Sequence, residues 1–144
     1  MRSLRTLVVS LVLSIVAVTP ARASDMQGTL SVIGLERSSG EVGVAVVSHA
    51  PGCGADVPWV QAGMGAVVTQ GDVNPSWGPL ALGLLREGMD PQALCDTLYK
   101  RDPGYLRRQI GVLDRRGRPG GYTGLELTSF SGGVIDTKIG RAHV

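Results

Sequence analysis

Ser48 and His49 are adjacent side chains that could do chemistry, because an imidazole base can activate a hydroxyl as a nucleophile. Neighbouring residues in a strand point to opposite faces, so a Ser48–His49 dyad requires a bend at the strand end. His49 is the only histidine before the last six residues, which makes it the one candidate imidazole base. The alternative is a loop histidine whose ring is hydrogen-bonded to backbone.

Four further side chains could form a binding site: Trp59, Gln70, Asn74 and Trp77. Two indole rings and two amides have the composition of a ligand cleft, in which apolar walls surround a few polar groups. The alternative is that these side chains pack in the core and the loops. The sequence holds no phosphate-binding loop, EF-hand or Gly-x-Ser-x-Gly motif.

Cys53 and Cys95 are the only cysteines of the chain. In an oxidising compartment they could form a disulfide, and closing the segment between them would stabilise the fold by roughly 4 kcal/mol. The alternative places Cys95 in the apolar stripe of a helix as a buried free thiol. Because the two cysteines lie far apart and no C-x-x-C motif occurs, we predict no metal and no cofactor.

The loop His49–Pro58 follows the Ser48–His49 pair and connects two apolar strands, predicted at Glu41–Ser48 and Gly65–Gln70. In the first of these strands the residues of both alternating faces are apolar. A strand with one face in water alternates apolar and polar residues, so we expect this strand to be covered on both sides.

Turn and capping residues divide the rest of the chain. A five-residue turn, 36–40, predicts a hairpin between the first two strands, and Asp90 followed by Pro91 predicts a helix N-terminus. The remaining predicted elements are strands at Gly28–Leu35, Arg108–Asp114 and Gly121–Leu127, a helix that follows 74–79 and stops at Gly88, and a helix that ends near Arg101. Three strands, two helices and two strands predict an antiparallel α+β fold.

Both ends of the chain lie outside the predicted domain, 24–138. Met1–Ala23 has a charged start, a short apolar run and an A-x-A cleavage signal, which predict a secretory signal peptide. Residues 139–144 resemble the translation of a sequencing adapter, which predicts that the domain is C-terminally truncated. The alternatives are an uncleaved anchor at the first end and a genuine C-terminus at the second.

The positive charge of the chain comes from these two ends. The whole chain has 14 basic and 12 acidic residues, a formal charge of +2. Removing Arg2, Arg5, Arg22 and Arg141 leaves 10 basic against 12 acidic residues, so residues 24–138 carry −2. We therefore predict no nucleic-acid partner. No apolar run after the signal peptide is long enough to span a membrane, so we also predict no membrane association after signal cleavage.

Six segments between Gly40 and Gly124 resemble, in order, an uncharacterised bacterial family, domain of unknown function ten-twenty-eight. They are GEVGVAVVSH, VPW, AGMGAVVTQ, NPSWGP, QIGVLD and YTG. That family belongs to the Ntn-hydrolase-like, proteasome-related superfamily. The resemblance covers residues 29–124 and implies an αββα sandwich, with two sheets face to face and helices outside.

The resemblance also implies a nucleophile at Thr29. In Ntn hydrolases a Thr, Ser or Cys at an exposed N-terminus attacks a carbonyl, and its own α-amine, with a pKa of about 8, is the base. Signal cleavage before Ser24 leaves residues 24–28 ahead of Thr29, so a second cleavage is required. No lysine or arginine lies between Ser38 and Leu85 to assist the nucleophile, as proteasome-type enzymes require.

We therefore expect a secreted or periplasmic protein with one of two functions. The first is an Ntn-type hydrolase that cleaves an amide bond, and the alternative is a non-catalytic binding or assembly module of the bacterial envelope. In either case the partner is a small molecule or a peptide, and analogy with the superfamily implies a homo-oligomer.

Overall fold

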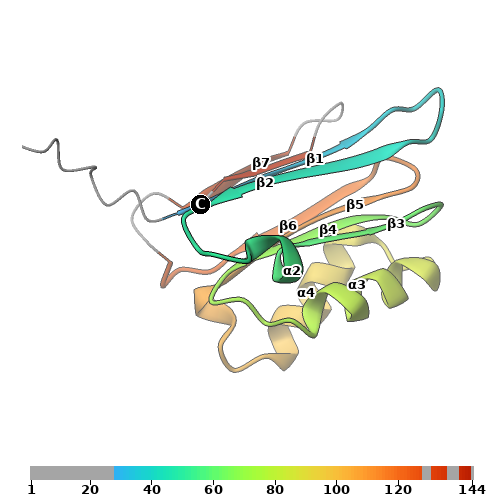
Figure 1. Ribbon diagram of the computed structural model, residues 1–144. Coiled ribbons are helices and arrows are strands. Elements are labelled where there is room, and N and C mark those ends of the chain that lie inside the picture. Colours follow the sequence, from blue (N-terminus) through green and yellow to red (C-terminus); the bar gives the residue numbers. More distant parts are fainter. Residues whose placement is uncertain (1–27, 128–130, 136–139, 144) are drawn as a thin grey trace, which may run out of the picture.

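The computed structural model describes residues 28–127 and 131–135, and the backbone of 140–143. Two antiparallel four-stranded sheets are stacked face to face, and helices cover the outer face of one of them (Figure 1). The predicted mixed α+β fold is therefore confirmed. The predicted signal peptide, Met1–Ala23, lies outside the described residues.

Sheet A has the strand order β2-β1-β8-β7. Its strands are β1 (Thr29–Leu35), β2 (Val42–Ser48), β7 (Gly132–Ile135) and β8 (Gly140–His143). The predicted hairpin is confirmed, because β1 pairs with β2 from Thr29 opposite Ser48 to Leu35 opposite Val42. The Glu36 N–H closes the turn by donating to the Glu41 carbonyl at 2.8 Å. Strand β8 overlaps the predicted adapter segment, 139–144.

Sheet B has the strand order β3-β4-β5-β6. Its strands are β3 (Pro58–Gln61), β4 (Gly65–Gly71), β5 (Arg108–Asp114) and β6 (Pro119–Thr123). Strands β4 and β5 lie where the sequence predicts them. Strand β3 starts at the last residue of the predicted loop, His49–Pro58, and continues into a segment where the sequence predicts no strand. Strand β6 starts and ends earlier than predicted. After Thr123 the chain leaves the sheet, and the Glu126 N–H donates to the Leu106 carbonyl at 2.8 Å.

The helices are α2 (Cys53–Asp56), α3 (Trp77–Arg86) and α4 (Pro91–Arg101), followed by a 3₁₀ turn, η1 (Tyr105–Arg107). Helix α4 has the predicted bounds, since Asp90 caps it by accepting from the N–H groups of Gln92 and Ala93. Helix α3 begins at Trp77, inside the segment that the sequence predicts to precede it. None of the described helices is long and apolar enough to span a membrane.

Each face of sheet B borders a separate hydrophobic core. Val67 and Val112 pack with α3 and α4 on one face. Val68 and Leu113, the next residue of each strand, pack with Ile33 and other side chains of sheet A. Sheet B is thus covered on both sides, as its apolar sequence requires.

Sheet A, in contrast, is covered on one side only by the residues that the structure describes. Gly43, Ala45 and Val47 of β2 point away from sheet B and are exposed, Val47 to 71%. The prediction that both faces of this strand are covered is therefore wrong for the described structure. The physical reason is that the described helices α3 and α4 lie on sheet B (Figure 1), so one helical layer of the expected sandwich is described.

Candidate functional site

The hydroxyl groups of Thr29 and Ser48 meet at one end of sheet A. Thr29 opens β1, Ser48 closes β2, and the two residues are directly opposite in the antiparallel register. Paired residues point to the same face of a sheet, which here is the face toward sheet B. The two side-chain oxygens are 2.9 Å apart and partly buried, so one hydroxyl donates to the other.

His49 turns away from this pair. Its Nδ1 lies 3.0 Å from the Gly28 nitrogen, which donates to it, and 3.2 Å from the Gly28 carbonyl oxygen. The Ser48 hydroxyl instead accepts from the Ala50 N–H at 3.1 Å. Within the described residues no hydrogen bond joins Ser48 to the His49 ring, so the imidazole lies beside the residue that precedes Thr29.

A chain of polar side chains, three buried and one half-buried, lies between the two sheets at the same end of the molecule. Gln70 accepts from the Ser31 hydroxyl and donates to the Gln109 carbonyl oxygen, each at 2.5 Å. Gln109 in turn donates to the Thr123 hydroxyl at 2.9 Å. Both glutamines are 1% exposed, and we refer to Ser31, Gln70, Gln109 and Thr123 as the inter-sheet polar network.

This network holds the start of β1 in place. The Gln70 amide also donates to the Thr29 carbonyl oxygen at 3.3 Å, and Gln109 donates to the Gly132 carbonyl oxygen at 2.9 Å. No buried side-chain nitrogen or oxygen of the described residues lacks a hydrogen-bond partner. A fully satisfied buried network is rigid, so it fixes the backbone on which the Thr29 hydroxyl is placed.

The sequence identified Gln70 but missed the other three members of the network. The signal that could have found them is a polar residue on the inward face of an otherwise apolar strand. Ser31 in TLSVIGL and Gln109 in RQIGVLD are such residues. The Ser31–Gln70 and Gln70–Gln109 contacts could not be deduced, because each of these hydrogen bonds joins residues 39 positions apart in the sequence.

The two tryptophans lie on the other side of sheet B. Trp77 is buried in the core between α3 and the sheet. Trp59 packs against Gly78, where an added side chain would overlap the indole ring, and its Nε1–H donates to the Asp56 carbonyl at 3.1 Å. Because sheet B separates them from Gln70, the tryptophans and the glutamine do not share one cleft.

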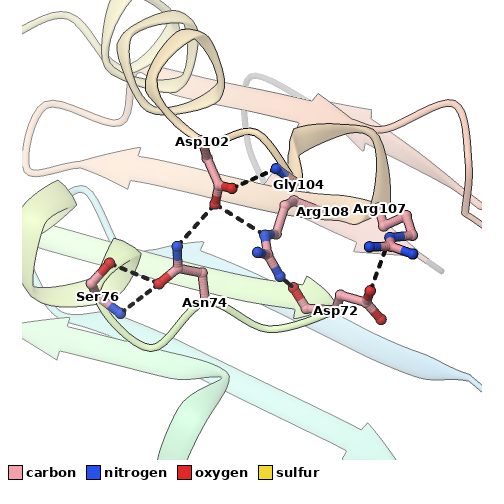
Figure 2. A network of polar contacts seen from close by, with 7 residues as sticks. All are labelled: Asp72, Asn74, Ser76, Asp102, Gly104, Arg107 and Arg108. Atoms are coloured by element: carbon pink, nitrogen blue, oxygen red, sulfur yellow. Dashed lines mark hydrogen bonds and ion pairs between the residues drawn. The ribbon is translucent and has the colours of Figure 1, made fainter.

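Asn74 belongs to a third environment, the polar cluster of Figure 2. Its amide nitrogen donates to Asp102 at 2.9 Å, and its oxygen accepts from the backbone and the hydroxyl of Ser76. Asp102 also accepts from Arg108 at 3.1 Å and from the Gly104 N–H at 2.8 Å. These contacts join the loop before α3 to the turn after α4, which is a structural role.

The Asp102 carboxyl titrates below its ordinary range. Burial by itself raises its pKa, but hydrogen bonds from Asn74, Arg108 and Gly104 together with the Arg108 charge outweigh that effect, so the pKa is lowered. A lowered folded-state pKa contributes stability above the unfolded-state value of 3.8, and this contribution is lost as the pH falls through the folded value.

We expect Asp102→Asn to lower the free energy of unfolding by about 2 kcal/mol at pH 7, because hydrogen bonds to a charged group are lost. The difference from the original chain should shrink at about pH 3, because the contribution is lost as the pH falls below 3.8 through the lowered folded-state pKa of Asp102. Urea denaturation at both pH values measures the difference in the free energy of unfolding between the two chains. The control is Asp72→Asn in the exposed Arg107–Asp72 pair, 3.1 Å apart and 62% exposed at the aspartate, where we expect less than about 0.5 kcal/mol. Equal effects of the two variants would contradict the prediction.

Cys53 and Cys95 are both free, so the possible disulfide is not formed, and Cys95 is the buried thiol of the alternative interpretation. Cys53 packs at the core between the sheets, whereas Cys95 is fully buried among α3, α4 and sheet B. Sheet B therefore lies between the two thiols. Burial raises the pKa of Cys95 to about 12, which leaves it protonated and unreactive. The described residues contain no cluster of His, Cys, Asp and Glu that could hold a metal ion.

These features define a class of protein: a mixed α+β fold of two stacked antiparallel sheets, with a hydroxyl pair and a buried amide network between them at one end. The chain belongs to a family of unknown function, DUF1028, whose model matches residues 29–141. Among curated proteins, none matches the sequence.

A solved structure with the same fold is that of protein SPO2555 from Silicibacter pomeroyi, a DUF1028 protein. The two structures superpose with a TM-score of 0.78 at 24% sequence identity, over 81% of this chain and 52% of the other. At this identity the likeness shows the fold alone. The chain spans about half the length of that protein.

Proposed function

We propose that the protein is an exported amide-bond hydrolase of the Ntn type, in which Thr29 is the nucleophile. The observation that carries the proposal is the position of the Thr29 hydroxyl. It lies at the start of a strand between two stacked sheets, 2.9 Å from a second hydroxyl, and Gln70 holds its backbone. The family match also begins at Thr29, so the residues before it lie outside the shared domain.

The proposed reaction needs a free α-amine on Thr29. This amine takes the proton of the hydroxyl as the Thr29 oxygen attacks the carbonyl carbon of an amide, and the same proton then goes to the leaving amine. Water hydrolyses the resulting ester and restores the hydroxyl. Ser48 orients the Thr29 hydroxyl through their hydrogen bond. In the proposed mechanism the α-amine of Thr29 is therefore the base, as in other Ntn hydrolases.

The N-terminus of the exported chain tests the proposal. We expect intact-mass measurement and N-terminal sequencing to find a chain that starts at Thr29, after cleavage of the Gly28–Thr29 bond. The control is Ser24→Ala, which changes the residue after the predicted signal cleavage and leaves residues 28 and 29 intact. A mature chain that keeps Ser24 at its N-terminus would contradict the proposal, since residues 24–28 would block the amine.

A second candidate function is a binding or assembly module of the bacterial envelope that uses the same fold without turnover. The observation that favours it is the contact between His49 and Gly28, which holds the residue before Thr29 in place. A chain that retains Ser24 and binds a small molecule or peptide without cleaving it would support this function instead. Both proposals include a signal peptide and a secreted or periplasmic location for the protein.

A further inference from the structure

A cavity of about 170 Å³ lies between the two sheets, where strands β5 and β6 of sheet B face β1 and β7 of sheet A. We refer to it as the inter-sheet cavity. Ile33 and Ile135 contribute apolar side chains to its wall, and none of the described residues that line it is charged. Burying a charged group there would be costly without a partner, so the cavity selects an uncharged, apolar group.

Glycines create this space. Elsewhere between the sheets valine and leucine side chains fill the layer, but at the cavity Gly111, Gly121 and Gly133 occupy three of the facing strands. Neither the backbone angles nor the packing requires glycine at position 121. Its φ is not in the left-handed region, and an added Cβ would meet only the Ile110 oxygen at 3.5 Å and Ile135 at 3.7 Å.

The cavity is polar at one side, where Gln109 and Thr123 line it. Gln109 is hydrogen-bonded to Gln70, and Gln70 is hydrogen-bonded to the Thr29 carbonyl oxygen. The cavity therefore borders the inter-sheet polar network that holds the proposed nucleophile. A ligand seated in it would place an apolar group among the glycines and a polar group toward the network.

We propose that the inter-sheet cavity binds the apolar side chain of an amide substrate, of the size of leucine or phenylalanine. The size argument is direct, because a protein cavity of roughly 150 Å³ holds one benzene molecule, and this cavity measures about 170 Å³. This names the substrate class of the proposed hydrolase and rests on that function. The binding itself does not depend on turnover and can be tested without it.

The test titrates the Thr29→Ala chain, in which the proposed nucleophile is absent, with N-acetyl-leucine amide and N-acetyl-phenylalanine amide. We expect two-dimensional amide NMR spectra to show shifts at Gly121, Thr123 and Gly133, whereas N-acetyl-glycine amide leaves them unchanged. Gly121→Val fills the cavity and should weaken binding at least ~10-fold, as expected when a pocket for one side chain is lost. Gly43→Val is the matched control, since Gly43 faces open space on β2, and its affinity should stay unchanged.

Equal binding of the glycine amide, shifts confined to other residues, or unchanged affinity of Gly121→Val would each overturn the inference. If the spectrum of Gly121→Val shows an unfolded chain, Gly121→Ala adds one methyl group instead and should still weaken binding. The two proposals fail separately. If amides bind in the cavity but the original chain hydrolyses none of them, the proposed function is excluded and the binding role of the cavity is kept. If leucine and glycine amides are hydrolysed equally fast, the role of the cavity is excluded and the proposed function is kept.

Discussion

Thr29→Ala should reduce hydrolysis of a leucine anilide on the order of 10³-fold or more, because the attacking oxygen is removed while the fold is kept. Losses of this size follow removal of a nucleophile from other hydrolases. Thr29→Ser keeps both the hydroxyl and the α-amine, so we expect it to retain measurable activity. Release of the chromogenic amine from N-acetyl-leucine p-nitroanilide measures the rate.

The experiment separates chemistry from processing when each chain is produced with Met directly before residue 29. Methionine removal then exposes the α-amine of residue 29 in the original chain and in both variants, without cleavage of the Gly28–Thr29 bond. Ser48→Ala is the matched control: it removes the neighbouring hydroxyl, 2.9 Å away, and should slow the reaction about 10-fold, because a hydrogen bond that orients the nucleophile is lost. Full activity of Thr29→Ala would exclude Thr29 as the nucleophile.

Elements with local signals could be predicted from the sequence. The Asp90 carboxylate caps α4 by accepting from the N–H groups of Gln92 and Ala93, and Pro91 presets the first helical φ, so the predicted bounds are those observed. Strand β3 has four residues and no periodicity, and it exists because it pairs with β4. Strands β7 and β8 lie in glycine-rich sequence. Strand β8 pairs with β1 across most of the chain, and β7 pairs with β8.

The exposed face of β2 shows a different limit. An apolar strand indicates that both of its faces suit a core, but the pattern does not say which layer covers each face or whether the same chain supplies it. Strand β4 has a similar pattern and is covered on both faces, because the helices pack on its outer side. The two strands differ in their position in the fold, which the local sequence does not contain.

Only part of the candidate site could be predicted, because the local sequence does not contain the position of each strand in the fold. Ser48 and His49 diverge as the strand alternation requires, and the imidazole contacts backbone, which was the alternative interpretation. The pairing of Thr29 with Ser48 follows from the hairpin register, in which Leu35 lies opposite Val42. The predicted five-residue turn places Leu35 opposite Glu41 and Thr29 opposite Val47, so it does not give this pair. The amide network could not be predicted, because Gln70 and Gln109 meet only when β4 and β5 pair.

Gln70→Met should have the largest effect on stability of the substitutions considered, about 3 kcal/mol or more. Methionine fills a similar volume, but Ser31, Gln109 and the Thr29 carbonyl lose their hydrogen-bond partner in a buried layer. Leaving buried polar groups unsatisfied costs about 1–3 kcal/mol each, and neighbouring losses are not additive. Urea denaturation monitored by circular dichroism measures the free energy of unfolding.

A double-mutant cycle shows whether the network acts as a unit. Gln109→Met alone should also be destabilising, whereas the double variant should cost at least about 1 kcal/mol less than the sum of the two, because each substitution removes the group that the other leaves unsatisfied. Gln61→Met on β3 is the control. Its side chain accepts an exposed hydrogen bond from Arg86 at 2.9 Å, so we expect a change below about 0.5 kcal/mol. Additive effects would show that the two amides stabilise the sheets independently, and the network would then not be the rigid support on which the placement of Thr29 depends.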